Sequence, residues 1–370
     1  MAELYIGLMS GTSGDGIDAV LVDFSQAAPK LLATYYSSYT PELREKIFSL
    51  CESGADEVRR LGELDIILAK EFAKAANDLL TQQAISADQI KAIGSHGQTI
   101  RHSPLHPHRF TMQIGDPNTI TAETGITTVA DFRRKDIALG GQGAPLVPAF
   151  HHAIFASQQK NRAIVNIGGI ANITLLPQNQ NATVIGFDTG PGNTLMDSWI
   201  ETHHQQHYDT QGNWAQQGNL HINLLNQLLR DQYFDLQPPK STGREYFNLI
   251  WLQKHLNQAS QDISPVDVQR TLAELTTLNI VNAIKKHFQQ GEILVCGGGA
   301  HNHFLMSRLQ ELAKPQFTLD STERLGIHPD WVEAMAFAWL AKQTLNYAPG
   351  NLPSVTGARK ASVLGGIYYP

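Results

Sequence analysis

The sequence of 370 residues contains little cysteine and no long apolar run. Its two cysteines, Cys51 and Cys296, cannot build a disulfide scaffold, and neither stands in a Cys/His spacing typical of structural zinc. No stretch approaches the roughly 18 apolar residues of a membrane helix, and the N-terminus lacks the basic and apolar regions of a leader. We therefore expect a soluble, cytoplasmic protein that makes no use of a membrane.

Basic residues are also fewer than acidic ones: the sequence contains 28 Lys and Arg and 34 Asp and Glu, which gives a net charge of −6 at pH 7. A nucleic-acid-binding protein needs a basic face, so this balance argues against a nucleic-acid partner. Hydrophobic residues make up 42% of the chain, which is ample for folding. The length exceeds what one hydrophobic core usually serves, so we expect two domains.

Short apolar runs that end in glycine or polar turns occur in both halves of the chain. Runs at 4–9, 19–24 and 31–39 predict an antiparallel meander, and residues 58–83 show the three- and four-residue spacing of a helix. Strand-like runs recur from 162, 172 and 183, followed by a helix from 194 with Asn193 as its expected cap. The repetition predicts an α/β protein with a duplicated fold.

The expected domain boundary follows from this pattern alone. We expect an N-terminal domain of residues 1–138 together with a C-terminal tail at about 350–370, and a C-terminal domain of residues 139–349. A helical stretch from about 218 to 288 should be interrupted at Pro238-Pro239 and at Ser264-Pro265.

The first of three glycine-rich turns follows the first strand. It comprises Gly11, Thr12, Ser13, Gly14, Asp15, Gly16, Ile17 and Asp18. Its amides and hydroxyls suit phosphate, and an aspartate beside phosphate implies Mg²⁺, held by Asp15 through water. The turn matches neither GxxxxGK[ST] nor GxGxxG. A tight hairpin stabilised by Asp and Gly is an equally good interpretation of this motif alone.

The second turn places a carboxylate at a strand end, where it can act as a general base beside a phosphate subsite. Asp188 is that carboxylate, and it precedes Thr189, Gly190, Gly192 and Asn193 at a helix N-terminus. The alternative is an ordinary strand-to-helix turn capped by aspartate.

The third turn follows an apolar strand. Gly297, Gly298, Gly299 and Asn302 leave bare backbone against which a flat base such as adenine can lie. Consecutive glycines also allow close packing of a helix on a strand, which is the alternative. Cys296, just before them, is expected to be a buried structural thiol.

Together the three turns resemble the two phosphate segments and the adenosine segment of the actin, sugar kinase and heat-shock chaperone superfamily. The similarity to one family is closer. LMSGTSGDGIDAVLVDF, SHGQTIRH, QIGDPNTI, VADFRRKDIALGGQGAPLVP, VNIGGIANIT, GFDTGPGN and VCGGGAHN resemble the anhydro-N-acetylmuramic acid kinase family, in order, from about residue 5 to 368. The resemblance implies a two-domain actin-like ATPase fold with a nucleotide cleft, and a homodimer.

The resemblance also implies a reaction and its ligands. ATP, water and 1,6-anhydro-N-acetylmuramic acid give N-acetylmuramic acid 6-phosphate and ADP, a step of peptidoglycan recycling and amino-sugar metabolism, with Mg²⁺ as cofactor. Asp188 matches the family's catalytic aspartate. A conventional hexose kinase that phosphorylates a free hydroxyl is one alternative, and a chaperone or assembly ATPase with a protein partner is another.

The sugar must then be held by polar residues outside the ATP turns. The candidates are Ser95, His96, Gln98, Thr99, Asp116, Asn118, Arg133 and Glu333. Arg133, in DFRRKD, is the choice for the lactyl carboxylate, with a solvated charged loop as an equal alternative. Glu333 either touches the sugar or caps its helix. For His102, His106 and His108, a solvated loop is favoured over a zinc site.

Overall fold

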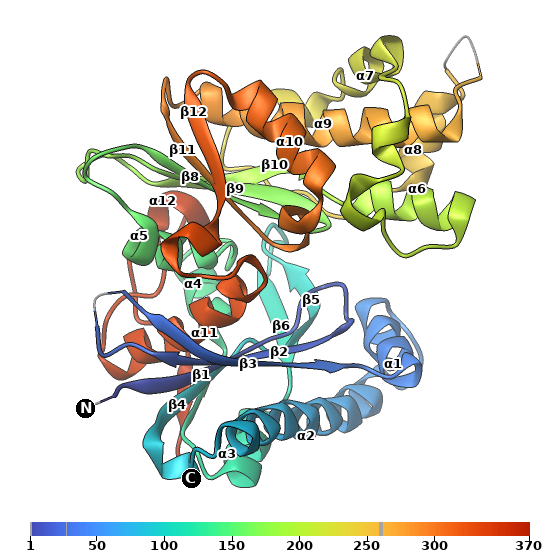
Figure 1. The fold of residues 1–370 in the computed structure, drawn as a ribbon. Coiled ribbons are helices and arrows are strands. Elements are labelled where there is room, and N and C mark those ends of the chain that lie inside the picture. The colour runs from blue at the N-terminus through green and yellow to red at the C-terminus, as the bar shows by residue number, and fades with distance from the viewer. Residues whose placement is uncertain (1, 27, 259–261) are drawn as a thin grey trace. The chain divides into compact units, whose positions relative to one another are not determined.

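The structure is a computed structural model that describes residues 2–26, 28–258 and 262–370. The chain forms two compact units (Figure 1): unit 1 contains Met1–Ile154 and Trp331–Pro370, and unit 2 contains Phe155–Asp330. The division differs from the sequence-based boundaries, because residues 139–154 and 331–349 lie in unit 1. The physical reason for the second difference is helix α11 (Val332–Leu345), which packs on the unit 1 sheet.

Unit 1 is built on a mixed sheet with the strand order β13-β7-β4-β1-β2-β3. The strands are β1 (Leu4–Met9), β2 (Gly16–Asp23), β3 (Lys30–Ser38), β4 (Ile90–Ser95), β7 (Thr128–Ala130) and β13 (Gly366–Tyr368). Strands β1, β2 and β3 form the predicted antiparallel meander, while β4 and β7 continue the sheet in parallel. The tail returns to unit 1 as predicted, since β13 pairs with β7.

Unit 2 repeats this arrangement with the strand order β10-β9-β8-β11-β12. Its strands are β8 (Arg162–Ile167), β9 (Ile170–Leu176), β10 (Ile185–Pro191), β11 (Gly291–Cys296) and β12 (Phe317–Ser321). Three antiparallel strands are again followed by two parallel ones. The shared order confirms the duplicated, two-domain actin-like ATPase fold.

Helices cover both faces of the unit 1 sheet. They are α1 (Pro41–Cys51), α2 (Glu57–Gln83), α3 (Pro117–Thr124), α4 (Phe132–Ala138), α5 (Val147–Phe155), α11 (Val332–Leu345) and α12 (Pro353–Thr356), beside a hairpin of β5 (Gln98–Ser103) and β6 (Phe110–Ile114). Ile6 and Leu8 of β1 belong to the core cluster that contains Phe72 of α2. Gly7, on the opposite face of the same strand, meets α11.

The contact between Gly7 and α11 leaves no room for a side chain. A Cβ on Gly7 would lie 1.9 Å from the Ala334 carbonyl oxygen, and one on Gly94 of β4 would lie 2.0 Å from that of Phe337. The backbone of α11 therefore touches the backbone of the sheet. This explains why the apolar helix predicted from Trp331 is buried in unit 1.

Unit 2 carries helices on its sheet and further helices that share a buried cluster of their own. They are α6 (Thr194–His204), α7 (Ile222–Leu228), α8 (Leu249–Leu256), α9 (Pro265–Lys285) and α10 (His303–Ala313). α9 begins at Pro265, where the Ser264 hydroxyl accepts a hydrogen bond from the Asp267 N–H, so the interruption predicted at Ser264-Pro265 is confirmed.

Short 3₁₀ turns join these elements. They are η1 (Ala87–Gln89), η2 (Thr210–Gly212), η3 (Ala215–Gln217), η4 (Gln232–Asp235), η5 (Gly298–His301), η6 (Thr322–Leu325) and η7 (Pro329–Trp331). Within the parts of the chain that the structure describes, no helix combines the length and the apolar character needed to cross a membrane.

Candidate functional site

The first glycine-rich turn connects β1 to β2 in unit 1. Thr12 and Asp15 are exposed, and the Ser13 hydroxyl donates a hydrogen bond of 2.5 Å to the Asp15 carboxylate. The Gly14 N–H donates to the Gly11 carbonyl at 3.2 Å, which closes a tight turn. The hairpin interpretation and the phosphate interpretation are therefore compatible: the backbone is folded on itself, while a hydroxyl and a carboxylate face solvent.

Hydrogen bonds run from this turn to the residues expected to hold the sugar. The Gln98 side-chain amide donates to the Gly11 carbonyl at 3.1 Å and accepts from the Ser10 hydroxyl at 2.6 Å. His96 Nδ1 lies 3.0 Å from the Ser10 carbonyl oxygen, and its Nε2 lies 2.8 Å from Arg133 Nη2. The polar ends of β4 and β5 thus form one network with the first turn.

His96 and Arg133 have their charge states fixed by this environment. Burial, reinforced by the charge of Arg133, lowers the pKa of His96 to about 3, so His96 is neutral and its Nε2 accepts from Arg133. Arg133 also donates to the Gly143 carbonyl at 2.8 Å and interacts electrostatically with Glu333. These bonds use three of its five N–H groups and leave two for a carboxylate ligand.

Arg133 lies on a short helix. The segment Phe132–Ala138 forms α4, with Asp131 as its N-cap. Arg134 and Lys135 are exposed, whereas Asp136 is fully buried and accepts hydrogen bonds from Gly143 N–H, Asn351 and Thr356. Asp136 ties α4 to the loop that follows it and to residues 351 and 356. The solvated-loop interpretation fits only the two exposed cations.

Glu333 and Ser95 show that unit 1 has polar groups suited to a ligand. Burial raises the pKa of Glu333, and the nearby charge of Arg133 opposes the shift. The Ser95 hydroxyl is buried and has no hydrogen-bond partner among the described residues. An orphaned buried hydroxyl at the end of β4 fits a sugar hydroxyl as its partner. Thr99, nearby on β5, accepts from the Gln113 amide at 3.1 Å.

Asp116 and Asn118 have a structural role in this structure. The Asp116 carboxylate caps α3 and accepts hydrogen bonds from the Thr119 N–H at 2.8 Å, the Thr119 hydroxyl at 2.7 Å and the Asn118 side-chain amide at 3.0 Å. These bonds, together with helix-cap geometry, account for the polar turn without a ligand. Their assignment to the sugar stays a prediction.

Asp188 lies on β10 of unit 2, beside a bulge between Asp188 and Gly190. Its carboxylate accepts a hydrogen bond from the Thr242 N–H at 3.0 Å. Burial raises the pKa of Asp188 to about 6, against the opposing effects of that hydrogen bond and of the Lys240 charge. A bulge of this kind re-aims a side chain, and a carboxyl with this pKa can take a proton near neutral pH.

The residues that hold Asp188 were missed by the sequence analysis. The Tyr233 hydroxyl donates to the Asp188 carbonyl at 2.8 Å, and the Asp188 N–H donates to the Lys240 carbonyl at 3.2 Å. The Thr242 hydroxyl is buried without a partner in the described part of the chain. The signal that could have found them is the polar, glycine-containing turn Lys240-Ser241-Thr242-Gly243.

The amides of the second turn are largely occupied. The N–H groups of Gly192 and Asn193 donate to the carbonyls of Gly169 and Gly168, at 2.9 and 2.8 Å. Asn193 is not a side-chain cap of α6, because its amide donates to the Ile167 carbonyl at 3.2 Å. The Thr189 hydroxyl donates to the Ala171 carbonyl at 3.2 Å. Phosphate contacts at Thr189, Gly190, Gly192 and Asn193 therefore stay predictions.

The third turn divides into packed and open glycines. A Cβ on Gly299 would lie 2.4 Å from Ile167, and one on Gly297 would lie 2.2 Å from Asn166, so close packing explains both. Gly298 meets only the Asn193 amide, at 3.9 Å, and is the glycine that offers open backbone to a base. The Asn302 side chain caps α10 by accepting from the Leu305 N–H at 3.0 Å.

A zinc site is not supported at the histidine-rich turn. His102, His106 and His108 are all exposed, and His102 lies on β5 with its Nδ1 3.0 Å from the Thr111 hydroxyl. No group of three or more His, Cys, Asp or Glu side chains in the described ranges could hold a metal ion. Any Mg²⁺ at Asp15 would therefore depend on water and phosphate oxygens for its other ligands, which matches how Mg²⁺ is usually bound.

Comparisons with known proteins cover the whole chain. Residues 3–370 match the family model described as anhydro-N-acetylmuramic acid kinase. Curated proteins of that name are 53% identical in Coxiella burnetii (99% of this chain, 98% of that protein), 54% in Saccharophagus degradans (100% and 99%) and 56% in Shewanella amazonensis (98% and 98%). The similarity therefore extends over both units.

Proposed function

The chain belongs to the anhydro-N-acetylmuramic acid kinase family, and we propose that it opens 1,6-anhydro-N-acetylmuramic acid with water and transfers the γ-phosphoryl group of ATP to O6. The products are N-acetylmuramic acid 6-phosphate and ADP. The chain is thus a phosphotransferase that acts on a small sugar in cell-wall recycling. The observation that carries this proposal is identity of 53–56% over nearly the full length of the relatives.

Asp188 acts as the general base in this proposal. It takes a proton from water as the water oxygen bonds to C1, the bond from C1 to O6 breaks, and O6 bonds to the γ-phosphorus while ADP leaves. Formation of the O6–phosphorus bond removes the need for a separate acid. The support is a pKa of about 6 and the backbone hydrogen bonds that fix the carboxylate.

The network in unit 1 supplies the sugar and phosphate contacts. Ser95, with its orphaned hydroxyl, bonds a sugar hydroxyl, and Arg133 pairs with the lactyl carboxylate through its two remaining N–H groups. The charge of Glu333 acts on the same guanidinium and favours its ionised form. Thr12 is exposed on the first turn, where it can donate to ATP phosphates, and exposed Asp15 reaches them only through Mg²⁺ and water.

Isotope labelling of the product tests the reaction. In H₂¹⁸O, the proposed reaction places one ¹⁸O at the anomeric oxygen of the phosphorylated sugar, and the label is read by mass spectrometry of the product with its phosphate removed. A conventional hexose kinase would phosphorylate a free hydroxyl and leave the sugar unlabelled, apart from slow anomeric exchange that a control with finished product measures. Phosphorylation without label above that control would overturn the hydrolytic mechanism.

Mg²⁺ is proposed at Asp15 through water, where it would neutralise phosphate charge. Asp15→Ala removes an exposed carboxylate that no buried group depends on. We expect the Mg²⁺ concentration needed for half-maximal turnover to rise severalfold, because the cation loses one anchor, while folding is unchanged. A titration identical to that of the wild type would leave Asp15 with the hairpin role alone.

Two further properties are proposed from the family resemblance. We propose a cytoplasmic location and a homodimer. Light scattering of the purified protein tests the second proposal: a mass of two chains is expected, and a single-chain mass at micromolar concentration would contradict it.

A further inference from the structure

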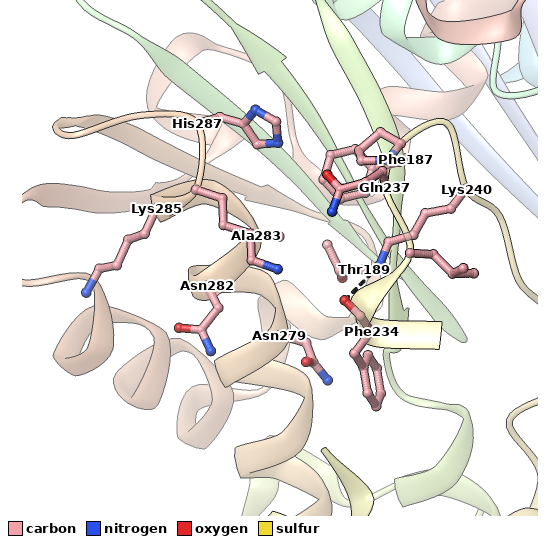
Figure 2. Close-up of a pocket in the computed structure, with 13 residues that line it drawn as sticks. Phe187, Thr189, Phe234, Gln237, Lys240, Asn279, Asn282, Ala283, Lys285 and His287 are labelled. Carbon is pink, nitrogen blue, oxygen red and sulfur yellow. Dashed lines mark hydrogen bonds between the residues drawn. The ribbon is translucent and has the colours of Figure 1, made fainter. Parts of the chain in front are cut away.

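Unit 2 contains a pocket of about 620 Å³ whose lining shares only Thr189 with the residues predicted to bind the nucleotide or the sugar. One wall is β10, through Phe187 and Thr189, and the other is the C-terminal half of α9 from Asn279 to its end (Figure 2). The segment from Phe234 to Lys240 closes the third side. The volume lies within the range of roughly 300–1,000 Å³ that holds small organic ligands.

The ionisable residues of the pocket lining are all basic. Lys240, Lys285, Lys286 and His287 belong to its lining, and no carboxylate does among the residues that the structure describes. Burial and then the charge of Lys286 lower the pKa of Lys240, so these two ammonium groups repel each other. A bound anion would relieve that repulsion, since it offers both cations an opposite charge.

The Lys240 ammonium is held in place without an ion pair at hydrogen-bond distance. It donates to the Tyr233 carbonyl at 3.1 Å and to the Phe234 carbonyl at 3.5 Å, the latter drawn in Figure 2. It also lies 4.6 Å from the centre of the Tyr233 ring. Carbonyls and rings orient this cation. The charges of Asp235 and Asp188 act on it, but no carboxylate of the described residues forms an ion pair with it within 4.0 Å, so an anion can still bind there.

An unsatisfied donor lies in the wall that α9 forms. The Nδ2 atom of Asn279 is buried and has no hydrogen-bond partner in the described part of the chain. Asn282 and Gln237 add two more side-chain amides to the lining. Amides both donate and accept hydrogen bonds, so they suit hydroxyl groups as well as phosphate oxygens. The orphaned amide is a group whose partner is expected to be a ligand.

The rest of the lining is apolar. Phe187, Phe234, Leu236 and Pro238 surround the polar groups. A bare inorganic anion would leave these side chains without contact, whereas a ligand with an uncharged ring would cover them. Phenyl rings, three amides and several cations together suit a ligand that combines a ring, hydroxyl groups and a phosphate.

We propose that this pocket binds a small phosphorylated sugar. It is separate from the proposed general base, because the Asp188 carboxylate is bonded to the Thr242 N–H and is not part of the lining. Lys240 connects the two: its side chain lines the pocket, and its carbonyl accepts from the Asp188 N–H. A ligand in the pocket would therefore contact the same segment, through Lys240, that holds the backbone of Asp188 in place.

Direct binding to the full-length protein tests the proposal without ATP or the anhydro sugar. Glucose 6-phosphate is the probe, and glucose and inorganic phosphate are the comparisons, each titrated by calorimetry. We expect saturable binding of the probe, no measurable binding of glucose, and at least tenfold weaker binding of inorganic phosphate. Binding of inorganic phosphate as tight as that of the probe would overturn the assignment to a phosphorylated sugar.

Variants locate the binding. Lys286→Glu reverses an exposed charge in the pocket, and Asn279→Leu removes the orphaned amide; each should weaken probe binding at least tenfold. Lys254→Glu, an exposed charge reversal on α8 outside the lining, is the matched control and should leave binding unchanged. If Asn279→Leu lowers the melting temperature, its effect on binding could come from disturbed folding, and the test then rests on Lys286→Glu alone. If the probe does not bind, or if Lys286→Glu binds it as tightly as the wild type does, the proposal is wrong. The assay measures binding without turnover, so its result does not depend on whether the proposed reaction is correct.

Discussion

Asp188 is positioned through main-chain groups: its own N–H and C=O, and the N–H of Thr242. Such bonds hold a carboxylate in place without pairing it with a strong cation, so burial remains the larger influence and raises its pKa to about 6. A base with this pKa is ionised at neutral pH and still binds a proton well. The residue is therefore suited to proton abstraction.

Replacement of Asp188 by Asn keeps the shape of the side chain and removes the base. We expect turnover to fall roughly 10²–10⁴-fold while ATP binding persists. Asp235→Asn, an exposed carboxylate of η4 in the same unit, is the matched control and should retain turnover. The assignment fails if Asp188→Asn works at a near-normal rate.

The ionisation of Asp188 should also determine how turnover depends on pH in the acidic range. Only ionised Asp188 can accept the proton from water, so wild-type turnover should decline as the pH falls through about 6. Measurement of the initial rate from pH 5 to 8 tests this. A rate that is constant down to pH 5 would mean that another group is the base.

The role of Asp188 could be predicted from the sequence, but the residues that hydrogen-bond to it could not. A carboxylate at a strand end before Thr-Gly-Pro-Gly stands out in the local sequence. Thr242 lies 54 residues further along the chain, in a stretch without regular secondary structure, and reaches Asp188 only because the sheet is folded. Local patterns carry no information about such long-range backbone contacts.

At the scale of elements, the fit between α11 and the unit 1 sheet depends on glycine. Gly7 and Gly94 let the helix backbone reach the strands β1 and β4, and Glu333 is carried on that helix. The position of Glu333 relative to Arg133 thus depends on two positions without side chains. The sequence predicted the helix correctly, but its depth in the fold follows from these contacts.

Gly7→Ala should disrupt this fit. The new Cβ would lie 1.9 Å from a helix carbonyl, and overpacking of this kind costs about 1–3 kcal/mol or more. Gly62→Ala, in the second turn of α2 with nothing within 4 Å of its Cβ, is the control and should stabilise by about 0.5–1 kcal/mol. Urea unfolding of both variants measures the difference, and equal stabilities would contradict the close approach.

Glu292 joins three elements of unit 2. Its carboxylate is 2% exposed and lies within 2.5–2.8 Å of Lys160, of Arg162 on β8 and of Arg324 in η6. Burial raises the pKa of Glu292, but the hydrogen bonds from these three cations outweigh it and bring the pKa to about 2. The ionised carboxylate therefore contributes stability above its unfolded pKa of about 4.3, and this contribution is lost as the pH falls from about 4 to 2.

Glu292→Gln should cost about 3 kcal/mol at pH 7, near the lower end for a broken buried pair, because Lys160 and Arg324 are partly exposed. The difference from wild type should shrink as the pH falls below 4. Glu63→Gln breaks an exposed pair with Arg59 and should cost about 0.5 kcal/mol or less. Urea unfolding at pH 7 and pH 3 tests both, and a pH-independent difference would contradict the linkage.

Two local features escaped the sequence analysis for physical reasons. DFRRKD forms a helix because buried Asp136 anchors the loop that follows it, through partners more than 200 residues away. Asn193 stands at the start of α6 in helical backbone, so its side chain cannot act as a cap and instead bonds to β8. In both cases a distant strand or loop overrides the local preference.

At the scale of the whole molecule, unit 2 is continuous in sequence and unit 1 is not. Unit 2 has two buried clusters of its own, one against the sheet and one among α6 to α9. Unit 1 needs residues 331–370 to supply α11 and β13. The expected two domains are present, and what the sequence pattern missed is that the long C-terminal helix belongs to the first of them.

Separate expression of the two segments tests this asymmetry. We expect residues 155–330 to fold alone with a cooperative unfolding transition, because their core is complete. Residues 1–154 alone should lack such a transition, because one face of β1 and β4 has lost α11. Co-expression with residues 331–370 should restore it, and a stable fold of 1–154 by itself would contradict the dependence on α11.

Because unit 1 is made of two separate parts of the chain, it cannot complete its fold until the end of protein synthesis. A ribosome adds roughly 5–20 residues per second, so on the order of 10–40 s separates the appearance of residue 154 from that of α11. Throughout that interval, the nascent β1 and β4 can pair but keep a bare apolar face that only the end of the chain can cover. Unit 2 can finish folding in the meantime. Slow codons placed between residues 155 and 330 would lengthen the exposure of this face, and with it the demand for chaperones.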